Sequence, residues 1–322
     1  MADDRNAFIS ALPTQPGWVS RSLKQYQGFW HEEGFIPGIL SLQEKFRCKP
    51  DHIVLTSYPK SGTTWLKALL FSITNRSRYR ATDAAANGNP LERCNPHSCV
   101  PRLEVYAASN GDDPNPDPVL VNTHLAYSLL PKSMIHSECK IVYVAREPKD
   151  VLVSSWHFAV KLRSKDLPPL TFSEAFDMFC NGVSDFGPYW DHVMEYWNAH
   201  LKFPHKIFIL SYEDLMRRPV YNVKKLAVFI GHPFTDVEEE CGVAEDIVSL
   251  CSFEKLSNLE VNKIGTRSWA NGSVIKNEIF FRKAQIGDWK NYLTDEMRAR
   301  MDKITREKFK GTGLFDLMVL TS

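Results

Sequence analysis

The strongest constraint on the fold is a short apolar run that ends in a loop and passes directly into an amphipathic segment. The run is Ile-Val-Leu-Thr-Ser at 53–57, and Pro59 and Gly62 close it. From about residue 63 to residue 75, apolar side chains recur at spacings of three and four, which predicts a helix. These side chains are Trp65, Leu66, Leu69, Leu70 and Ile73. A buried strand followed by a helix is typical of an α/β sheet.

Three further apolar runs predict strands of the same kind, at 119–123, 141–145 and 207–211. Pro148 suits a first helical turn, which predicts a helix from there to about residue 162. Residues 77–118 are rich in Gly, Asn, Asp and Pro and predict a mostly irregular loop around one short helix. We expect one three-layer α/β domain over 51–322 with a central, mostly parallel sheet, onto which an aromatic-rich lead-in at 1–50 packs.

The composition narrows the class of protein. Hydrophobic residues make up 43%, enough for a real core, and 39 Lys and Arg nearly cancel 38 Asp and Glu. That balance argues against nucleic-acid and anionic-membrane partners, and no window approaches the ~20 apolar residues of a membrane span. We expect no signal peptide, because the first ten residues carry acids and no apolar run. The seven scattered cysteines form no C-x-x-C pair, so we expect reduced thiols, a cytoplasmic protein and no metal site.

The loop at 58–65, Tyr-Pro-Lys-Ser-Gly-Thr-Thr-Trp, is a candidate anion site. In open α/β sheets ligands lie beyond the carboxyl ends of the strands, and a helix start adds unpaired N–H groups and a positive dipole end. Gly62 lets the backbone approach a ligand, and Lys60 supplies a positive charge. Hydroxyl donors come from Ser61, Thr63 and Thr64. The simpler interpretation is a plain strand-to-helix turn with an exposed lysine. The loop is shorter than the Walker pattern and its lysine precedes the glycine, which weakens a kinase interpretation.

This octet resembles the 5′-phosphosulfate loop of the cytosolic sulfotransferase family, which is similar to the P-loop type. Matching motifs continue over roughly residues 35–315, and the Gly-Asp-Trp-Lys-Asn run at 287–291 resembles plant members most. The resemblance implies a sulfotransferase that uses 3′-phosphoadenosine-5′-phosphosulfate (PAPS) as co-substrate and releases 3′,5′-bisphosphoadenosine (PAP). It also implies a small hydroxylated acceptor and no metal.

The resemblance assigns the 3′-phosphate of the donor to Arg146 and Ser154, which lie eight residues apart at the start of the helix after residue 145. A guanidinium fork suits phosphate, although a surface cation at a strand end is the simpler interpretation of Arg146 alone. The resemblance also implies that Arg282, Lys283 and Ala284 fold over the same phosphate. The family pattern there is Arg-Lys-Gly, and alanine resists a positive φ at a cost of about 1–2 kcal/mol.

Aromatic side chains are the candidates for the adenine. The resemblance implies that the base stacks between Trp65 and Phe253, and that Tyr212 contacts it. Tyr212 follows the run at 207–211. Both stacking rings could equally be core residues.

His124, directly after the run at 119–123, is the candidate base. An acceptor hydroxyl needs a base that titrates near neutral pH, and histidine is suited to that, although a lone histidine is more often structural. The resemblance assigns His124 the catalytic role, with Lys60 neutralising the leaving phosphate. Animal members usually carry lysine two residues before the histidine, and here Asn122 could donate hydrogen bonds to the sulfuryl oxygens without a charge.

The sequence does not identify the acceptor. The resemblance implies a mostly apolar pocket built from the N-terminal aromatics, the 77–118 loop and neighbours of His157 and Phe158, and flavonoids, steroid-like hormones, hydroxyjasmonates and desulfoglucosinolates are acceptors in the plant branch. Two other functions stay possible, an ATP-dependent small-molecule kinase and a PAP-binding protein with weakened catalysis. We expect a monomer, because Asp295 and Ala299 replace the valine and glutamate of the dimer motif of animal relatives.

Overall fold

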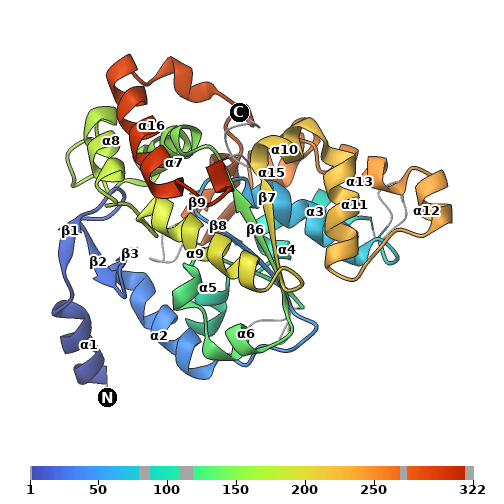
Figure 1. Cartoon of the computed structure of the whole chain (residues 1–322), viewed down its shortest axis with the longest axis horizontal. Helices are drawn as coiled ribbons and strands as arrows, with labels where there is room; N and C mark the ends of the chain where they lie inside the picture. Colours follow the sequence, from blue (N-terminus) through green and yellow to red (C-terminus); the bar gives the residue numbers. More distant parts are fainter. Residues whose placement is uncertain (1, 80–87, 109–118, 269–273, 316–322) are drawn as a thin grey trace.

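The computed structural model describes residues 2–79, 88–108, 119–268 and 274–315. Four parallel strands form its central sheet in the order β5-β4-β6-β7. Figure 1 labels β6 and β7 near the centre of the molecule. Their bounds are β4 (Ile53–Ser57), β5 (Leu120–Thr123), β6 (Lys140–Ala145) and β7 (Ile207–Ser211). The four predicted strands are therefore confirmed, with the second and third each starting one residue from the predicted position.

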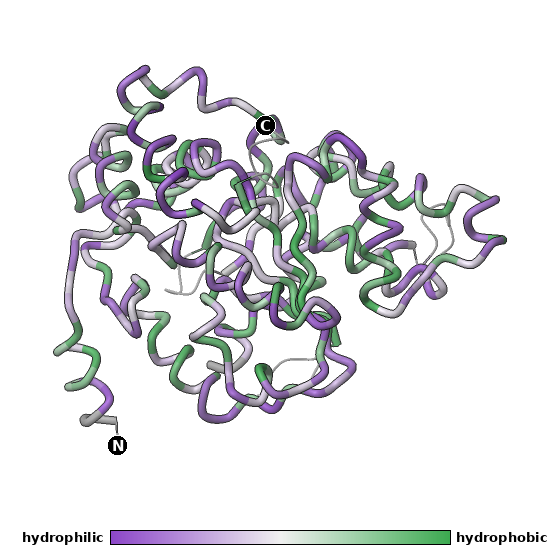
Figure 2. The backbone as a smooth tube through the Cα atoms, in the orientation of Figure 1, coloured by the Kyte–Doolittle hydropathy of each residue, from purple (hydrophilic) through white to green (hydrophobic). Residues whose placement is uncertain are grey.

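Helices cover both faces of this sheet. Successive side chains along each strand point to opposite faces, so each strand contributes apolar side chains to both faces. Val54 and Ile141 pack into one hydrophobic cluster, whereas Leu55 and Val142 pack into the other. Figure 2 shows the strands as a largely apolar centre with more hydrophilic segments outside. Two buried faces on one parallel sheet confirm the predicted three-layer α/β fold.

The first layer packs on the Val54 face. Its helices are α2 (Ile36–Lys45), α7 (Pro148–Leu162), α8 (Phe172–Cys180), α9 (Tyr189–Lys202) and α16 (Asp295–Phe309). The second layer packs on the Leu55 face. Its helices are α3 (Thr63–Asn75), α10 (Tyr212–Arg217), α11 (Pro219–Phe229), α13 (Val243–Leu250) and α14 (Phe253–Asn258). The helices predicted at 63–75 and from Pro148 to 162 are thus α3 and α7.

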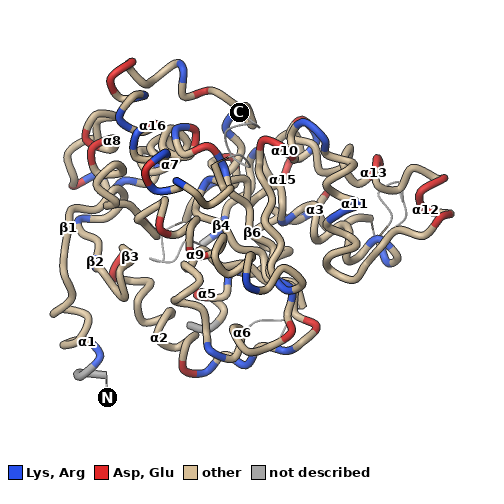
Figure 3. Tube along the Cα trace, viewed as in Figure 1, with Lys and Arg blue, Asp and Glu red and all other residues tan. Residues whose placement is uncertain are grey.

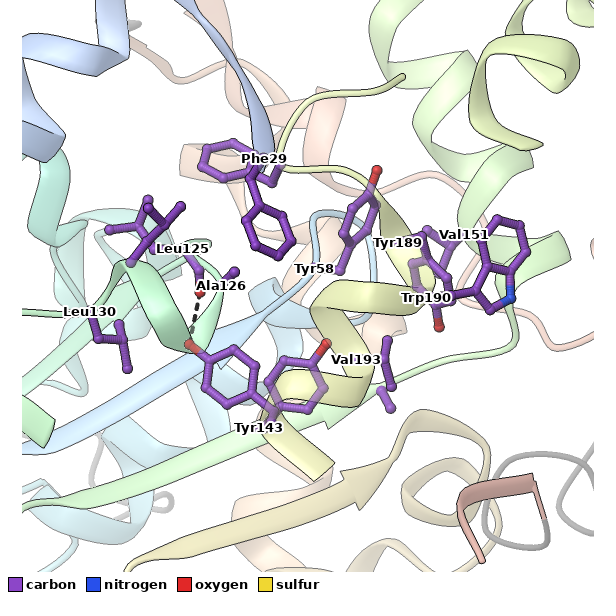
Figure 4. Close-up of a cluster of buried hydrophobic side chains, with 14 of the residues drawn as sticks. Phe29, Tyr58, Leu125, Ala126, Leu130, Tyr143, Val151, Tyr189, Trp190 and Val193 are labelled. Atoms are coloured by element: carbon purple, nitrogen blue, oxygen red, sulfur yellow. Dashed lines mark hydrogen bonds between the residues drawn. The ribbon is translucent and has the colours of Figure 1, made fainter. Parts of the chain in front are cut away.

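Aromatic rings dominate the first layer beneath the sheet (Figure 4). Tyr143 of β6 stacks on Tyr196 of α9 at 4.3 Å between ring centroids, and Tyr196 donates a 2.7 Å hydrogen bond to the Leu125 carbonyl. Tyr58 meets Tyr189 edge to face at 5.0 Å. The contact between Tyr58 and Tyr189 fixes the start of the loop that follows β4.

The N-terminal segment adds a small antiparallel sheet and short helices to the first layer. Its elements are α1 (Ala2–Ser10), β1 (Thr14–Pro16), β2 (Ser22–Tyr26), β3 (Phe29–Glu32) and the 3₁₀ turn η1 (Glu33–Phe35), followed by α2. The rings of Trp18, Phe29 and Phe35 are buried in the cluster that covers the Val54 face. The first fifty residues therefore share one hydrophobic core with the strands.

The segment at 77–118 is more helical than the sequence indicated. Residues 80–87 and 109–118 lie outside the described residues, but the rest contains η2 (Pro90–Glu92), α4 (Pro96–Cys99) and α5 (Leu103–Ala108). Asn89 and Asn95 each cap the following turn through a side-chain oxygen, and a proline follows each asparagine. The prediction of one short helix in an irregular loop was wrong, because both Asn-Pro pairs start helical turns.

The remaining elements are short and lie at the edges. They are η3 (Tyr127–Leu129), α6 (Lys132–His136), α12 (Asp236–Glu240), α15 (Glu260–Lys263), β8 (Thr266–Ser268), β9 (Val274–Lys276), η4 (Asn277–Phe280) and η5 (Asp288–Asn291). Figure 3 shows both signs of charge scattered over the outer segments, and β4 and β6 almost free of charge. Among the described residues, no helix combines the length and apolar character that crossing a membrane demands.

Candidate active site

The four strands of the central sheet each deliver a predicted site residue at their carboxyl end. The phosphate-loop candidate starts at Tyr58, directly after β4, and His124, Arg146 and Tyr212 directly follow β5, β6 and β7. Because the strands are parallel, these four ends meet at one edge of the sheet. A cavity of about 740 Å³ opens there.

Nearly all predicted site residues line this cavity. They are Lys60, Gly62, Thr63, Thr64, Trp65, His124, Arg146, Ser154, Tyr212, Phe253, Arg282, Lys283 and Ala284. Ser61 differs, because it is fully buried beside the cavity and its hydroxyl has no hydrogen-bond partner among the described residues. Phe158 also lines the cavity, whereas His157 bonds to the Tyr292 hydroxyl at 2.8 Å.

The loop after β4 presents an uncapped helix start to the cavity. Gly62 is the N-cap of α3 at φ +105°, and within the described part of the chain no side chain caps this helix start. A Cβ at Gly62 would lie 2.6 Å from the Tyr212 ring, so both backbone and space require glycine. The open N–H groups and the helix dipole together favour an anion.

Lys60 carries the charge of this loop. Its Nζ lies 4.0 Å from the centroid of the Phe158 ring, and its backbone has φ +69°. Burial lowers the pKa of Lys60 to about 7, and the nearby charges of Arg146 and Arg282 add to this. An anionic ligand beside the ammonium would raise that pKa again, which couples ligand binding to the charge of Lys60.

Arg146 ties three parts of the site together. Its guanidinium donates to the Lys60 carbonyl at 3.1 Å and to the Gln285 carbonyl at 3.0 Å, and it lies 4.4 Å from the centroid of the Tyr212 ring. Asp150, one helical turn further along α7, is an ion-pair partner at 3.7 Å. The arginine thus joins the loop after β4 to the segment at 281–290, and it lines the cavity with Ser154.

Asp150 fastens the segment at 281–290 to α7, a role that the sequence analysis missed. Its carboxylate accepts from the backbone N–H of Gly287 at 2.7 Å and of Trp289 at 3.0 Å. An aspartate in the first turn of a helix looks like ordinary pairing with the helix dipole. Its partners lie 137 and 139 residues away along the chain, so no local pattern could have identified this contact.

The cations of the same segment are held by a second aspartate. Arg282 and Lys283 donate to Asp288 at 2.6 and 2.8 Å. Burial alone would raise the pKa of Asp288, but these hydrogen bonds outweigh it and hold the pKa at about 2. Ala284 has φ +50°, so it adopts the left-handed conformation that the family pattern assigns to glycine.

His124 has its tautomer set by the strand beside it. The Ser57 carbonyl can only accept, so the 2.8 Å contact makes Nδ1 the donor and leaves the lone pair on Nε2. Burial lowers the pKa of His124 well below its usual value, and Arg102 adds to this. A neutral imidazole with a free lone pair at a cavity wall can accept a proton from a bound hydroxyl.

Two buried residues orient His124, and no local sequence pattern indicates either of them. Glu104 accepts from the Thr123 hydroxyl at 2.9 Å and from the His124 N–H at 3.3 Å. His192 donates from Nε2 to the His124 carbonyl at 3.0 Å. Both come from helices distant in the chain, and only the fold brings them to β5.

Asn122 does not have the role that the sequence suggested. Its amide nitrogen donates to the carbonyls of Leu55 at 3.2 Å and of Thr123 at 3.1 Å, and its side chain is buried. With both amide hydrogens engaged by the backbone, Asn122 has none to offer sulfuryl oxygens. It stabilises the end of β5 and contributes to the cavity wall.

His97 is a further contact of the loop after β4 that no sequence pattern indicated. Its Nε2 lies 2.9 Å from the Thr64 hydroxyl, and its ring stacks on Phe280 at 4.1 Å between centroids. Asn95 accepts from the His97 N–H at 2.9 Å as the cap of α4. If Nε2 carries the hydrogen, it donates to Thr64 and leaves the hydroxyl hydrogen of Thr64 for an anion.

The aromatic residues predicted to contact the adenine lie on the side of the cavity that α3 and α14 form. Trp65 meets Tyr212 edge to face at 6.1 Å, and Phe253 lies 6.4 Å from Phe281. The Phe253 side chain is 38% exposed, which is unusual for a core ring and leaves a face for a planar ligand. Among the described residues no three His, Cys, Asp or Glu side chains gather as metal ligands would.

Comparisons with known proteins agree with this geometry. The family model described as the sulfotransferase domain matches residues 50–313. Cytosolic sulfotransferase 16 of Arabidopsis thaliana is 46% identical over 314 residues, covering 95% of this chain and 90% of the relative. Flavonol 4′-sulfotransferase of Flaveria chlorifolia is 46% identical, covering 91% of this chain and 90% of the relative. The crystal structure of a mouse sulfotransferase complexed with PAP superposes with a TM-score of 0.68 at 26% identity, covering 91% of this chain and 95% of that one.

Proposed function

The chain belongs to the sulfotransferase family, and from this premise we propose that it transfers the sulfuryl group of PAPS to a hydroxyl of a small acceptor, with His124 as the base. The observation that carries the proposal is the His124 tautomer. Nδ1 of His124 donates to the Ser57 carbonyl at 2.8 Å, which leaves a free lone pair on Nε2. His124 lines the same cavity as Lys60 and the uncapped start of α3.

The donor would occupy the half of the cavity that the four strand ends surround. The 5′-phosphosulfate suits the N–H groups at the start of α3, with the ammonium of Lys60 beside the bridging oxygen. The 3′-phosphate suits Ser154, Arg146 and the cations of the segment at 281–290. The adenine suits the space beside Trp65, Tyr212 and the exposed face of Phe253. This geometry positions the donor before reaction.

Transfer then proceeds in line. Nε2 of His124 takes the proton of the acceptor hydroxyl as its oxygen attacks sulfur. The bond between sulfur and the bridging oxygen breaks, the sulfate ester forms, and PAP leaves with the electron pair. Lys60, protonated once the anionic donor is bound, stabilises the charge that develops on the bridging oxygen. The chemistry needs no further group than these side chains and the donor.

The acceptor belongs in the rest of the cavity. Trp18 and Phe35 from the N-terminal segment, Phe158 from α7, and Phe186 supply apolar walls there. A relative named for flavonol sulfation makes a planar phenol a suitable first acceptor. The other classes of the plant branch, which are steroid-like hormones, hydroxyjasmonates and desulfoglucosinolates, belong in the same panel.

The test is a PAPS-dependent sulfation assay over that panel, paired with nucleotide titrations. We expect sulfated product from at least one acceptor and tighter binding of PAP than of ATP, with no requirement for Mg²⁺. Binding of ATP–Mg²⁺ in preference to PAP would favour the kinase. Tight PAP binding without product from any acceptor would instead indicate a PAP-binding protein that has lost catalysis. Near-normal turnover of Lys60→Ala would contradict the role given to Lys60.

A further inference from the structure

The acceptor half of the cavity contains a cluster of charged side chains that sulfuryl transfer does not use. Three cations line it, Lys67 from α3, Arg102 before α5, and Arg267 in β8. None belongs to the loop after β4 or to the segment at 281–290, and nothing in the donor assignment involves them. A mostly apolar pocket for a neutral phenol has no need of three cations.

Arg102 is the best placed of the three. Its guanidinium carbon lies 4.5 Å from the centroid of the Phe35 ring and 5.1 Å from that of the Phe186 ring. The Phe186 ring in turn lies 5.6 Å from the His124 ring, so one small molecule can reach both the guanidinium and the base. The side chain is 16% exposed, and it lines the cavity.

The hydrogen-bond donors of this arginine are poorly matched. Nε and Nη2 of Arg102 are buried and have no hydrogen-bond partner among the described residues, and Nε forms an ion pair with the Glu104 carboxylate at 3.6 Å. The other oxygen of Glu104 accepts hydrogen bonds from the Thr123 hydroxyl and from the His124 N–H. A planar fork with unpaired donors is suited to a carboxylate or sulfate group.

Arg267 repeats this pattern on the α3 side. Nη1 of Arg267 has no partner among the described residues, and Nη2 reaches only the His97 carbonyl at 3.4 Å. Lys67 donates to the Val100 carbonyl at 2.9 Å. Burial lowers the pKa of Lys67 well below its usual value, and the nearby charges of Arg267 and Arg102 lower it further.

Two acidic side chains also line this half of the cavity. Burial raises the pKa of Glu32 and, well above its usual value, that of Asp185, which favours their neutral forms. Arg102 opposes both shifts.

We propose that the acceptor carries an oxyanion, a carboxylate or a sulfate, in addition to the hydroxyl that His124 deprotonates, and that Arg102 binds this group with help from Arg267. This inference rests on the proposed function, because it names the acceptor class of the same site. The oxyanion fills the unpaired guanidinium donors, and the apolar rings hold the body of the acceptor.

The experiment compares acceptors that share one phenol and differ in charge. The set is 4-hydroxyphenylacetate, its methyl ester and tyramine, with 4-hydroxyphenyl sulfate as the sulfate arm and 4-hydroxycinnamate with its methyl ester as a longer pair. We expect kcat/KM to be higher by about tenfold or more for an anion than for the matched ester, with tyramine the poorest. The better of the carboxylate and sulfate arms identifies the oxyanion.

Variants show whether Arg102 is responsible. Arg102→Gln should remove most of the preference for anions, because it lowers kcat/KM for the anion far more than for the matched ester. Arg267→Gln should reduce the preference by less. Arg298→Gln, at an exposed position of α16, is the matched control and should leave the preference intact. PAP affinity of every variant, measured by calorimetry, shows that the donor site and the fold are unchanged.

Three results would overturn the inference without touching the proposed function. Equal use of acid and ester by the wild-type protein is the first, and a preference for tyramine, which would make Asp185 and Glu32 the determinants, is the second. The third is an equal loss on anions and esters in Arg102→Gln, which would mark a structural arginine. If no phenol is sulfated, equilibrium binding of the same acids and esters to the PAP complex decides the charge preference independently.

Discussion

The two halves of the cavity are built in different ways. The half proposed for the donor rests on residues that directly follow three parallel strands, β4, β6 and β7, and its loop is a single contiguous octet between β4 and α3. The acceptor half is assembled from Trp18, Phe35, Arg102, Phe186 and Arg267, which are far apart in the chain. A donor common to all reactions can be served by a fixed backbone motif, whereas an acceptor is recognised by side chains that can vary. Changes in the donor half should therefore affect every acceptor alike.

The largest effect is expected where the two halves meet, at His124. We expect His124→Ala to lower kcat by about 10²–10⁴-fold with every acceptor, because the general base is lost. PAP affinity should be unchanged, since no donor contact is assigned to the imidazole. Stopped assays and PAP calorimetry measure both, with His205→Ala, an exposed histidine outside the cavity, as control. A loss confined to some acceptors would move His124 into the acceptor half.

The same residue gives a pH dependence. Because burial and Arg102 lower the pKa of His124 below 6.5, the imidazole stays neutral and active at pH 6.5. The acidic limb of kcat/KM should therefore lie below pH 6.5, with activity falling only as the pH drops through the lowered pKa. An acidic limb above pH 6.5 would contradict the environment described for His124.

Gly62 tests the donor half by itself. Gly62→Ala would place a left-handed alanine with its Cβ 2.6 Å from the Tyr212 ring. The backbone term alone costs about 1–2 kcal/mol, so we expect PAP affinity to fall by roughly 5–30-fold or more, equally in assays with every acceptor. Gly34→Ala is the matched control, because no atom lies within 4 Å of its Cβ position. Unchanged PAP affinity in Gly62→Ala would contradict the close backbone approach.

The sequence predicts the two halves of the cavity to different extents. The strands, α3 and α7 were predictable because apolar runs, helical spacing and Pro148 are local signals. The residues after each strand were predictable because parallel strands align their ends. Glu104, Asp150 and Arg102 were not, because each acts through partners that only tertiary packing brings near. Asn122 shows the opposite error. It lies at the cavity wall, but both of its amide hydrogens are already donated to backbone carbonyls.

Lys60 allows a smaller, graded test of the donor half. Its pKa of about 7 means that the free protein loses this charge as the pH rises through 7, while bound PAP favours the protonated form. PAP affinity should therefore weaken above pH 7 by up to about tenfold per pH unit, with proton uptake on binding. Calorimetry in buffers of different ionisation enthalpy measures that uptake. Lys60→Arg, which stays charged, should abolish it, and persistent uptake in that variant would assign the proton to another group.

The smallest effect is expected at Ala284, and its sign makes it informative. Ala284 has φ +50°, a conformation that costs alanine about 1–2 kcal/mol and glycine little, although glycine loses about 0.5–1 kcal/mol through the unfolded chain. Ala284→Gly should therefore stabilise the protein by up to about 1 kcal/mol and tighten PAP binding about twofold to fivefold, with acceptor preference unchanged. Ala299→Gly, the same substitution at an exposed position inside α16, should destabilise by about 1 kcal/mol. Thermal unfolding of the two variants should thus shift in opposite directions, and a lowered Tm in both would show that the segment at 281–290 does not require the left-handed turn at Ala284.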